Sequence, residues 1–319
     1  ALIEDLITRT DYDIICLDRL DISGTLDRVK HVMDKYPEHA HRITFVYHDL
    51  KADINEYTRT KIGDINYIFH LAAGSHVDRS IDFPREFVMD NVLGTCSLLD
   101  FARKYCPNLD LFYYFSTDEV FGPAPDDVLY KEWDRYNSGN PYSAAKAGAE
   151  ELCLAYSNTY QMPMIITHCM NVFGERQHKE KYIPLCIDRS NTGEKIYIHA
   201  NKECNKAGSR FYIHTKDVSD AVLFLLDEWN KGNLKFCDKY NIVGSEEIDN
   251  LELAKRIASH VGKPLNYEMV DFHSSRPGHD LRYSLDGEKM AKLGWKPKSL
   301  TQRLHQTIDW YLENEEWLK

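Results

Sequence analysis

The 319-residue sequence predicts an α/β protein in which a doubly wound parallel sheet is followed by a smaller, mixed α/β C-terminal lobe. The first half alternates strand-like and helix-like segments, a pattern typical of parallel strands joined by helices that cover both faces of a sheet. The second half is less regular, and 43% of all residues are hydrophobic, which suffices for a full core. In open parallel sheets a ligand binds beyond the carboxyl ends of the strands, so we expect the functional residues there.

The spacing of apolar residues predicts each element. Residues 1–9 carry apolar side chains at helical spacing, and residues 13–17 form a short apolar run that ends at Asp18. Further strands are expected at 43–47, 66–71, 110–116 and 163–168, and helices at 85–105 and 142–160. In the second half the pattern predicts helices at 182–193, 216–229, 250–261 and 300–313, and a strand at 239–243.

Composition excludes several classes of function. A formal net charge of −11 argues against nucleic acid as a partner, and an anionic ligand would need local Lys and Arg residues to overcome that field. The eight cysteines form no CxxC pair and do not group with histidines, so we expect reduced thiols and no metal site. Because we find no apolar run of membrane-spanning length, we expect a soluble, cytoplasmic protein with no membrane partner.

Asp18 is the first candidate for a binding residue. In a Rossmann-like unit an acidic residue at the end of the second strand hydrogen-bonds the adenine ribose, and its charge favours NAD over NADP. A solvent-exposed Asp at a strand end is an equally good interpretation of this residue alone. We find no glycine-rich phosphate loop among the 319 residues. Since the acidic residue falls about 20 residues after such a loop, we expect that loop to lie immediately before Ala1.

Tyr142 and Lys146 are the main catalytic candidates. They are four residues apart in a predicted helix and therefore share one face. A nearby cation lowers the pKa of a phenol, so that its phenolate can act as a base. An amphipathic helix with a surface Lys gives the same spacing. The strand-end pair Ser116-Thr117 strengthens the catalytic interpretation, because it places a hydroxyl near the phenol.

Several stretches together resemble the extended short-chain dehydrogenase/reductases and, within them, the nucleotide-sugar 4,6-dehydratases that act on dTDP-glucose or UDP-glucose. These stretches are HLAAGSHVDRS at 70–80, NVLGT at 91–95, STDEVFG at 116–122, NPYSAAKAGAE at 140–150, NVFG at 171–174, EKYIPL at 180–185, the isolated Arg210 and RPGHDLRY at 276–283. The resemblance extends over almost the whole chain from Asp18 to Tyr283.

The resemblance implies NAD as cofactor and a role for each catalytic candidate. Tyr142 would take the proton of the sugar 4-hydroxyl while NAD accepts the hydride from carbon 4. Thr117 would form a hydrogen bond with the 4-oxygen. Glu119 would remove the proton on carbon 5, and a protonated Asp118 would donate to the departing 6-hydroxyl before the hydride returns to carbon 6. Neighbouring carboxyl groups push their pKa values apart, which allows one acid and one base. A solvated turn is the alternative for this pair.

Other functions remain open from the sequence. The alternative enzyme is a UDP-sugar 4-epimerase or a UDP-glucuronate decarboxylase, but the Asp118-Glu119 pair argues against both. A non-catalytic NAD-binding regulatory protein would explain the absent glycine loop, but not the retention of five catalytic candidates. The choice between thymine and uracil as the base stays open, with dTDP the first guess, and rhamnose or another deoxysugar is the expected destination of the product.

The resemblance also implies binding residues, carried over position by position. The residues expected at the cofactor, besides Asp18, Tyr142 and Lys146, are Asp49, Leu50, Ala72, Ala73 and Ser75. Those expected at the substrate, besides Thr117, are Asn171, Glu180, Lys181, Arg210, Arg276 and Tyr283. The sequence departs from the family pattern at Gly74, at Val172 and in the long polar stretch 199–209.

The expected division of labour follows from these assignments. We expect an NAD-binding domain over residues 1–174, to which 211–244 returns, and a mainly substrate-binding lobe over 175–319. A homodimer through the helices at 91–105 and 142–160 is implied by the resemblance, since relatives commonly pair these helices. Packing of the same helices on the sheet is the alternative, and periodicity does not separate the two.

Overall fold

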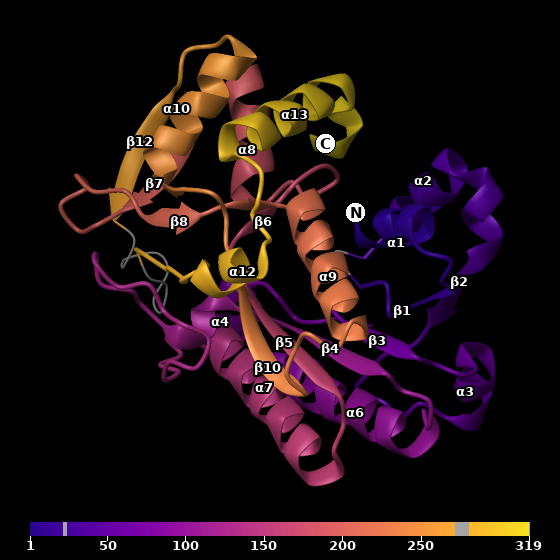
Figure 1. Cartoon of the computed structure of the whole chain (residues 1–319). Helices are drawn as coiled ribbons and strands as arrows, with labels where there is room; N and C mark the ends of the chain where they lie inside the picture. The colour runs from indigo at the N-terminus through magenta and orange to yellow at the C-terminus, as the bar shows by residue number, and fades with distance from the viewer. Residues whose placement is uncertain (22–23, 272–280, 319) are drawn as a thin grey trace. The chain divides into compact units, whose positions relative to one another are not determined.

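The computed structural model describes residues 1–21, 24–271 and 281–318, which form two compact units (Figure 1). The first unit consists of residues 1–120, 140–168 and 222–240, and the second consists of residues 121–139, 169–221 and 241–319. The functional boundary expected at residue 174 stays a prediction, and the packing units differ from it chiefly in placing 121–139 with the second unit.

Strands rich in β-branched and aromatic residues form the centre of the first unit, and β4 and β5 are the most buried of them. Strand β1 (Ile14–Asp18) pairs in parallel with β2 (Ile43–Tyr47). A four-stranded sheet has the order β10 (Cys237–Ile242), β5 (Met164–Cys169), β4 (Leu111–Thr117) and β3 (Tyr67–His70), and β3 and β4 are parallel. Among the described residues these are two separate hydrogen-bonded sheets. All the strands predicted in the first half are confirmed to within two residues.

Helices cover the sheets of the first unit. In chain order they are α1 (Leu2–Arg9), α2 (Asp27–Lys35), the 3₁₀ turn η1 (Pro37–Arg42), α3 (Glu56–Ile62), α4 (Val77–Asp82), α5 (Pro84–Phe87), α6 (Gly94–Tyr105) and α7 (Pro141–Tyr160). Helices α6 and α7 lie side by side along the four-stranded sheet (Figure 1). The core between them and the sheet includes Leu99, Phe112, Ala149, Cys153 and Ile166.

The single helix predicted over 85–105 is wrong in detail. The chain there forms α5, a π-helical segment η2 (Val88–Leu93) and then α6. The wide π turn contains buried Asn91, whose side chain accepts a hydrogen bond from the Gly74 backbone N–H and donates one to the Gly74 carbonyl, at 2.8 and 3.1 Å. A π turn of this kind is commonly found next to a functional site.

The second unit is built from three short strand pairs and a layer of helices. The pairs are β7 (Ile196–Ala200) with β12 (Tyr267–Asp271), β8 (Ser209–Phe211) with β11 (Glu247–Asp249), and β6 (Val172–Phe173) with β9 (Ile213–His214). The helices are α8 (Tyr182–Thr192), α10 (Asn250–Val261), α12 (Glu288–Leu293) and α13 (Leu300–Glu313), with α9 (Thr215–Asn230) preceding β10 and a final turn η4 (Glu315–Leu318). Helices α8, α10 and α13 pack on one another around Ile187, Leu253, Ile257, Leu304 and Ile308.

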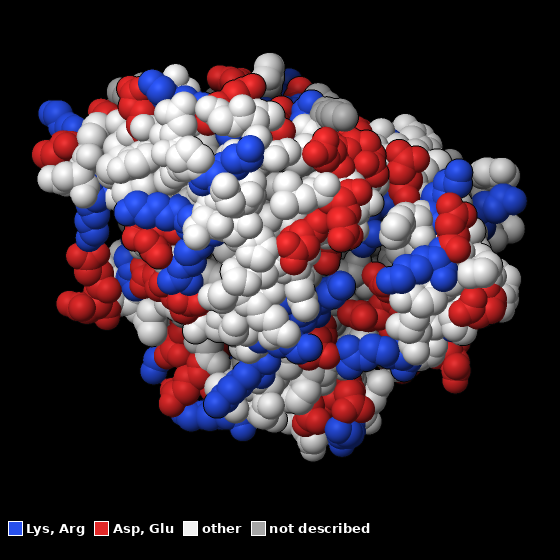
Figure 2. Space-filling model, turned by 90° about the horizontal axis from the view of Figure 1, so that it is seen from above, with Lys and Arg blue, Asp and Glu red and all other residues white. Residues whose placement is uncertain are grey.

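Charged side chains of both signs lie next to one another on the face shown in Figure 2, although the chain has a net charge of −11. Among the described residues, none of the helices combines the length and the apolar character needed to cross a membrane.

Gly122, the last residue of the STDEVFG segment, allows a prediction about the stability of the fold. Its φ is +75°, and a Cβ there would overlap the carbonyl oxygen of Asn137. Gly193 ends α8 with φ +79° and has open space around it. We expect Gly193→Ala to cost about 1 kcal/mol and Gly122→Ala roughly 2 kcal/mol more, because only the latter adds a steric clash to the unfavourable φ. Urea denaturation measures both, and equal losses would contradict the role of Asn137.

Candidate active site

The end of β4 carries two carboxyl groups in a sheltered position. The 3₁₀ turn η3 (Asp118–Phe121) follows the strand directly, so Asp118 and Glu119 come next after Thr117. Asp118 is 5% exposed, Glu119 is half-buried, and the Thr117 hydroxyl donates to Asp118 Oδ1 at 3.0 Å. The two carboxyl groups therefore differ in their exposure to water.

The start of α7 is tied to this turn. Asn140 caps the helix in a reciprocal capping box with Ser143, and Pro141 occupies its first position, which together fix where the helix begins. The same Asn140 side chain donates to Glu119 Oε2 at 3.1 Å. The residue that caps α7 thereby also holds Glu119, so the predicted base and the helix with the predicted Tyr and Lys form one hydrogen-bonded unit.

Tyr142 and Lys146 lie on the buried face of α7, as their spacing predicts. Tyr142 is 8% exposed, its ring packs edge-on against Phe87, and its backbone N–H donates to Ser80 Oγ at 3.2 Å. Lys146 is 4% exposed and donates from Nζ to the Phe115 carbonyl of β4 at 2.5 Å. Burial lowers the pKa of Lys146 to about 8. Its ammonium group therefore titrates close to neutral pH.

The residues expected at the cofactor lie at the carboxyl ends of three strands. Asp18 ends β1, is exposed, and accepts the Leu20 N–H at 2.7 Å. Asp49 and Leu50 follow β2 and are half-buried. Burial opposes ionisation of Asp49, but the Lys51 amide and ammonium outweigh it and hold the pKa of Asp49 below its usual value. Ala72, Ala73 and Ser75 follow β3 and are exposed, so this edge offers small side chains to a ligand.

Sequence reasoning missed the charges that organise this edge. Arg19 NH2 lies 2.8 Å from Asp90 Oδ2, and Lys51 Nζ lies 3.7 Å from Asp90 Oδ1. Asp90 belongs to the π segment η2 and precedes Asn91, whose side chain is hydrogen-bonded to the Gly74 backbone. The position of Arg19 directly after Asp18 is the signal that could have indicated it, whereas no sequence pattern indicates Asp90.

Two of the predicted substrate residues lie together in the second unit. The Arg210 guanidinium is 4.5 Å from the centre of the buried Tyr283 ring, and it donates to the Leu281 carbonyl at 2.7 Å. Asn171 and Glu180 are exposed. Lys181 occupies the N-cap position of α8, where its side chain makes no capping hydrogen bond, and it is half-buried. Arg276, the remaining candidate, lies outside the described residues.

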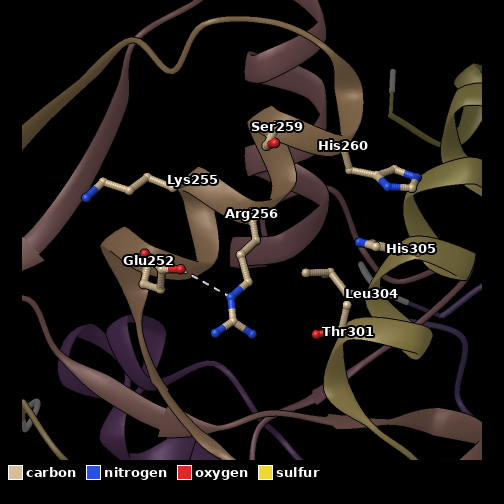
Figure 3. Close-up of a pocket in the computed structure, with 8 residues that line it drawn as sticks. All are labelled: Glu252, Lys255, Arg256, Ser259, His260, Thr301, Leu304 and His305. Carbon is tan, nitrogen blue, oxygen red and sulfur yellow. Dashed lines mark hydrogen bonds and ion pairs between the residues drawn. The ribbon is translucent and has the colours of Figure 1, made fainter.

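One groove within the described part of the chain lies away from these residues. A groove of about 650 Å³ lies in the second unit, between α10 and α13 (Figure 3). It is lined by Glu252, Lys255, Arg256, Ser259, His260, Thr301, Leu304 and His305. Within this groove Arg256 pairs with Glu252 at 3.3 Å, and His260 Nε2 lies 2.7 Å from Asp309 Oδ1. The candidate active site is therefore defined by the motif residues around β4 and α7 and not by this groove.

Known proteins that are similar to this chain include several 4,6-dehydratases. The family model described as GDP-mannose 4,6 dehydratase matches residues 1–308. The dTDP-glucose 4,6-dehydratase of Salmonella typhimurium is 33% identical, with 100% of this chain and 91% of that protein covered. The low-salt glycan biosynthesis protein Agl12 of Haloferax volcanii is 36% identical, with 98% and 94% covered.

Solved structures give the same picture of the fold. DesIV, a dTDP-glucose 4,6-dehydratase from Streptomyces venezuelae solved with NAD and TYD bound, superposes with a TM-score of 0.86 at 32% identity, covering 100% of this chain and 93% of that one. A Thermus thermophilus UDP-glucose 4-epimerase reaches a TM-score of 0.84 at 23% identity, covering 98% and 94%, and is similar in fold alone. The predicted Rossmann-like α/β class is confirmed.

Proposed function

The chain belongs to the GDP-mannose 4,6 dehydratase family, and on that basis we propose that it is an NAD-dependent nucleotide-sugar 4,6-dehydratase. Its substrate would be dTDP-glucose or UDP-glucose, and its product the 4-keto-6-deoxy sugar. The observation that carries the proposal is the sheltered Asp118-Glu119 pair after Thr117, joined through Asn140 to the helix of Tyr142 and Lys146. Relatives named dTDP-glucose 4,6-dehydratase support the same activity.

Tyr142 is the base of the first step in this proposal. Its phenol takes the proton of the sugar 4-hydroxyl, and the Lys146 cation on the same helix face stabilises the phenolate. Lys146 is suited to this role because it is buried and its charge is therefore only weakly screened by water. Thr117, at the end of β4, is placed to orient the 4-oxygen through its hydroxyl.

Asp118 and Glu119 divide the elimination between them. Loss of water across carbons 5 and 6 needs a base at carbon 5 and an acid at the 6-hydroxyl. Burial disfavours the charged form of a carboxyl group, so the buried Asp118, whose Oδ1 accepts from the Thr117 hydroxyl, is the better acid. Glu119 accepts from the Asn140 amide, which favours its ionised form and its role as base. An epimerase has no use for this pair.

NAD is compatible with the residues at the carboxyl edge of the first unit. The exposed Asp18 carboxylate suits the ribose hydroxyls, Asp49 and Leu50 flank the adenine position, and Ala72, Ala73 and Ser75 are small enough to let a flat ligand approach the backbone. When bound, NAD accepts a hydride from carbon 4 and later returns it to carbon 6. Solved relatives bound to NAD support this assignment.

The substrate diphosphate is assigned to the second unit. Arg210, already packed on Tyr283, provides a planar guanidinium that can bind phosphate oxygens in pairs. We place Asn171, Glu180, Lys181 and Arg276 around the same ligand. Between the two bases, we favour thymine, because the relatives with the stated activity are dTDP-glucose enzymes.

One assay tests the activity against its alternatives. The purified protein, supplied with NAD, is incubated separately with dTDP-glucose and with UDP-glucose, and the products are identified by NMR. We expect a 4-keto-6-deoxy sugar, formed faster from dTDP-glucose. Conversion to the galactose epimer would replace the proposal by a 4-epimerase. NAD binding without any turnover would leave a non-catalytic NAD-binding protein.

The wider setting is also part of the proposal. We infer a cytoplasmic homodimer whose product feeds deoxysugar synthesis, such as that of rhamnose. The dimer is supported by exposed apolar side chains along η2 and at the end of α7, where Val88, Leu93 and Tyr160 are 50%, 43% and 48% exposed. Exposed apolar side chains on a helical surface are often part of an interaction surface.

A further inference from the structure

A buried ionic cluster lies one helical turn beyond Lys146. Glu150 of α7 is fully buried, and its Oε1 atom lies 2.9 Å from Lys239 Nζ and 3.2 Å from His168 Nε2. His168 belongs to β5 and Lys239 to β10, so the cluster joins the helix to two neighbouring strands of the sheet. The side chains of all three residues are at most 4% exposed.

The cluster is not explained by stability alone. Moving charges out of water costs several kcal/mol per ion, and well-packed apolar residues are often as stable as a buried ion pair. Burial opposes ionisation of Glu150, but contacts with His168 and Lys239 outweigh it and hold the pKa of Glu150 far below its usual value. A permanent carboxylate is thus kept in the interior of the first unit, on the proposed catalytic helix itself.

Glu150 is the group best placed to influence Lys146. The two are four residues apart on the buried face of α7. The titratable groups that interact with the Lys146 ammonium are Cys153 and Glu150 of α7, His70 of β3 and Tyr114 of β4, and Tyr142 lies one helical turn before Lys146 on α7. Burial, and then Lys146 itself, lowers the pKa of His70 to about 3, while burial raises the pKa values of Cys153 and Tyr114 well above their usual range. Around neutral pH, Glu150 is therefore the one permanent anion of this set.

We propose that Glu150, held by His168 and Lys239, is a positioning residue that keeps Lys146 protonated and in place beside Tyr142. The inference rests on the proposed function, in which the Lys146 cation stabilises the Tyr142 phenolate. The carboxylate attracts the proton of Lys146, while Lys239 and His168 fix the carboxylate and moderate its field. Glu150 thus acts on Lys146 through its electric field along one face of α7, and neither a proton nor an electron is transferred between them.

The pH dependence of kcat/KM for dTDP-glucose tests the proposal. At the basic limb Lys146 loses its proton and activity falls. Glu150→Gln removes the anion that opposes this loss, so we expect the basic limb to move to lower pH by about one unit. Lys239→Met removes a positive charge beside the Glu150 carboxylate, so the carboxylate attracts the Lys146 proton more strongly. The basic limb should then move to higher pH. Glu151→Gln, at the next and exposed position of the same helix, is the matched control and should not move it.

Opposite shifts separate positioning from a merely structural role. A loss of packing would lower activity in both variants without moving the limb in opposite directions, and such a result, or unmoved limbs, would overturn the proposal. Thermal unfolding checks that each variant is folded. If Glu150→Gln does not fold, Lys239→Met carries the test, because it retains the Glu150 contact with His168, and a limb that stays put or moves to lower pH overturns the idea.

The test also distinguishes this proposal from the proposed function. If the unmodified protein forms no 4-keto-6-deoxy product, the proposed function fails. Titration of Lys146 Nζ by NMR in ¹⁵N-lysine-labelled protein then measures the same two shifts without turnover. A Lys146 titration that is unchanged by Glu150→Gln would show that the carboxylate does not control the ammonium.

Discussion

Tyr142→Phe is expected to abolish the first oxidation and to lower kcat by a factor of about 10³ or more, within the usual range for loss of a positioned base. The substitution removes the phenolic oxygen and leaves the ring packed on Phe87, so the fold should be kept. Without the phenolate, the proton of the sugar 4-hydroxyl has no acceptor. Mixing the variant with NAD and dTDP-glucose should then produce no absorbance from reduced nicotinamide.

Tyr160→Phe is the matched control for this experiment. Tyr160 ends the same helix but is 48% exposed, and its hydroxyl should be dispensable. We expect the control to show the same rise in absorbance as the unmodified protein. A normal rise in Tyr142→Phe would mean that another group takes the proton, and Tyr142 would then be only a packing residue.

The sequence predicted the parts of the fold that have strong periodicity. Helix α7 could be predicted because apolar positions recur over five turns after a clear N-cap. Strand β4 could be predicted because Leu111 to Tyr114 form a continuous run of apolar and aromatic residues, and the structure buries all four. Helices such as α2 and α3 were missed because they are short and mostly polar. The strands of two to five residues in the second unit are too short for a period to be seen.

The candidate site was predictable where its residues are contiguous in the chain. Thr117, Asp118 and Glu119 follow one another, and Tyr142 and Lys146 share one helical face, so spacing alone relates them. The contact of Glu150 with Lys239 joins a helix to a strand far along the chain, and it exists only once the sheet has formed. In the same way, the π turn that brings Asn91 to Gly74 has no counterpart in the helical pattern of 85–105.

Glu119→Gln should separate oxidation from elimination. The amide keeps the shape of the side chain and can still bond to Asn140 but cannot take a proton, so the 4-ketone should form while carbon 5 stays protonated. In deuterated water we expect reduced nicotinamide to appear and no deuterium to enter carbon 5, with product formation slowed by a factor of about 10²–10⁴. Mass spectrometry of the recovered sugar measures the exchange.

Asp118→Asn is the matched partner of this variant, because it removes the proposed acid and leaves the base. If the two carboxyl groups divide the work as proposed, this variant should exchange the proton on carbon 5 with solvent yet fail to release water from carbon 6. We therefore expect opposite deuterium contents at carbon 5 in the two variants, although both form product slowly. Deuterium uptake in Glu119→Gln, or its absence in Asp118→Asn, would contradict the assigned roles of acid and base. Formation of reduced nicotinamide in each variant is the control, because a general loss of structure would suppress oxidation as well as exchange.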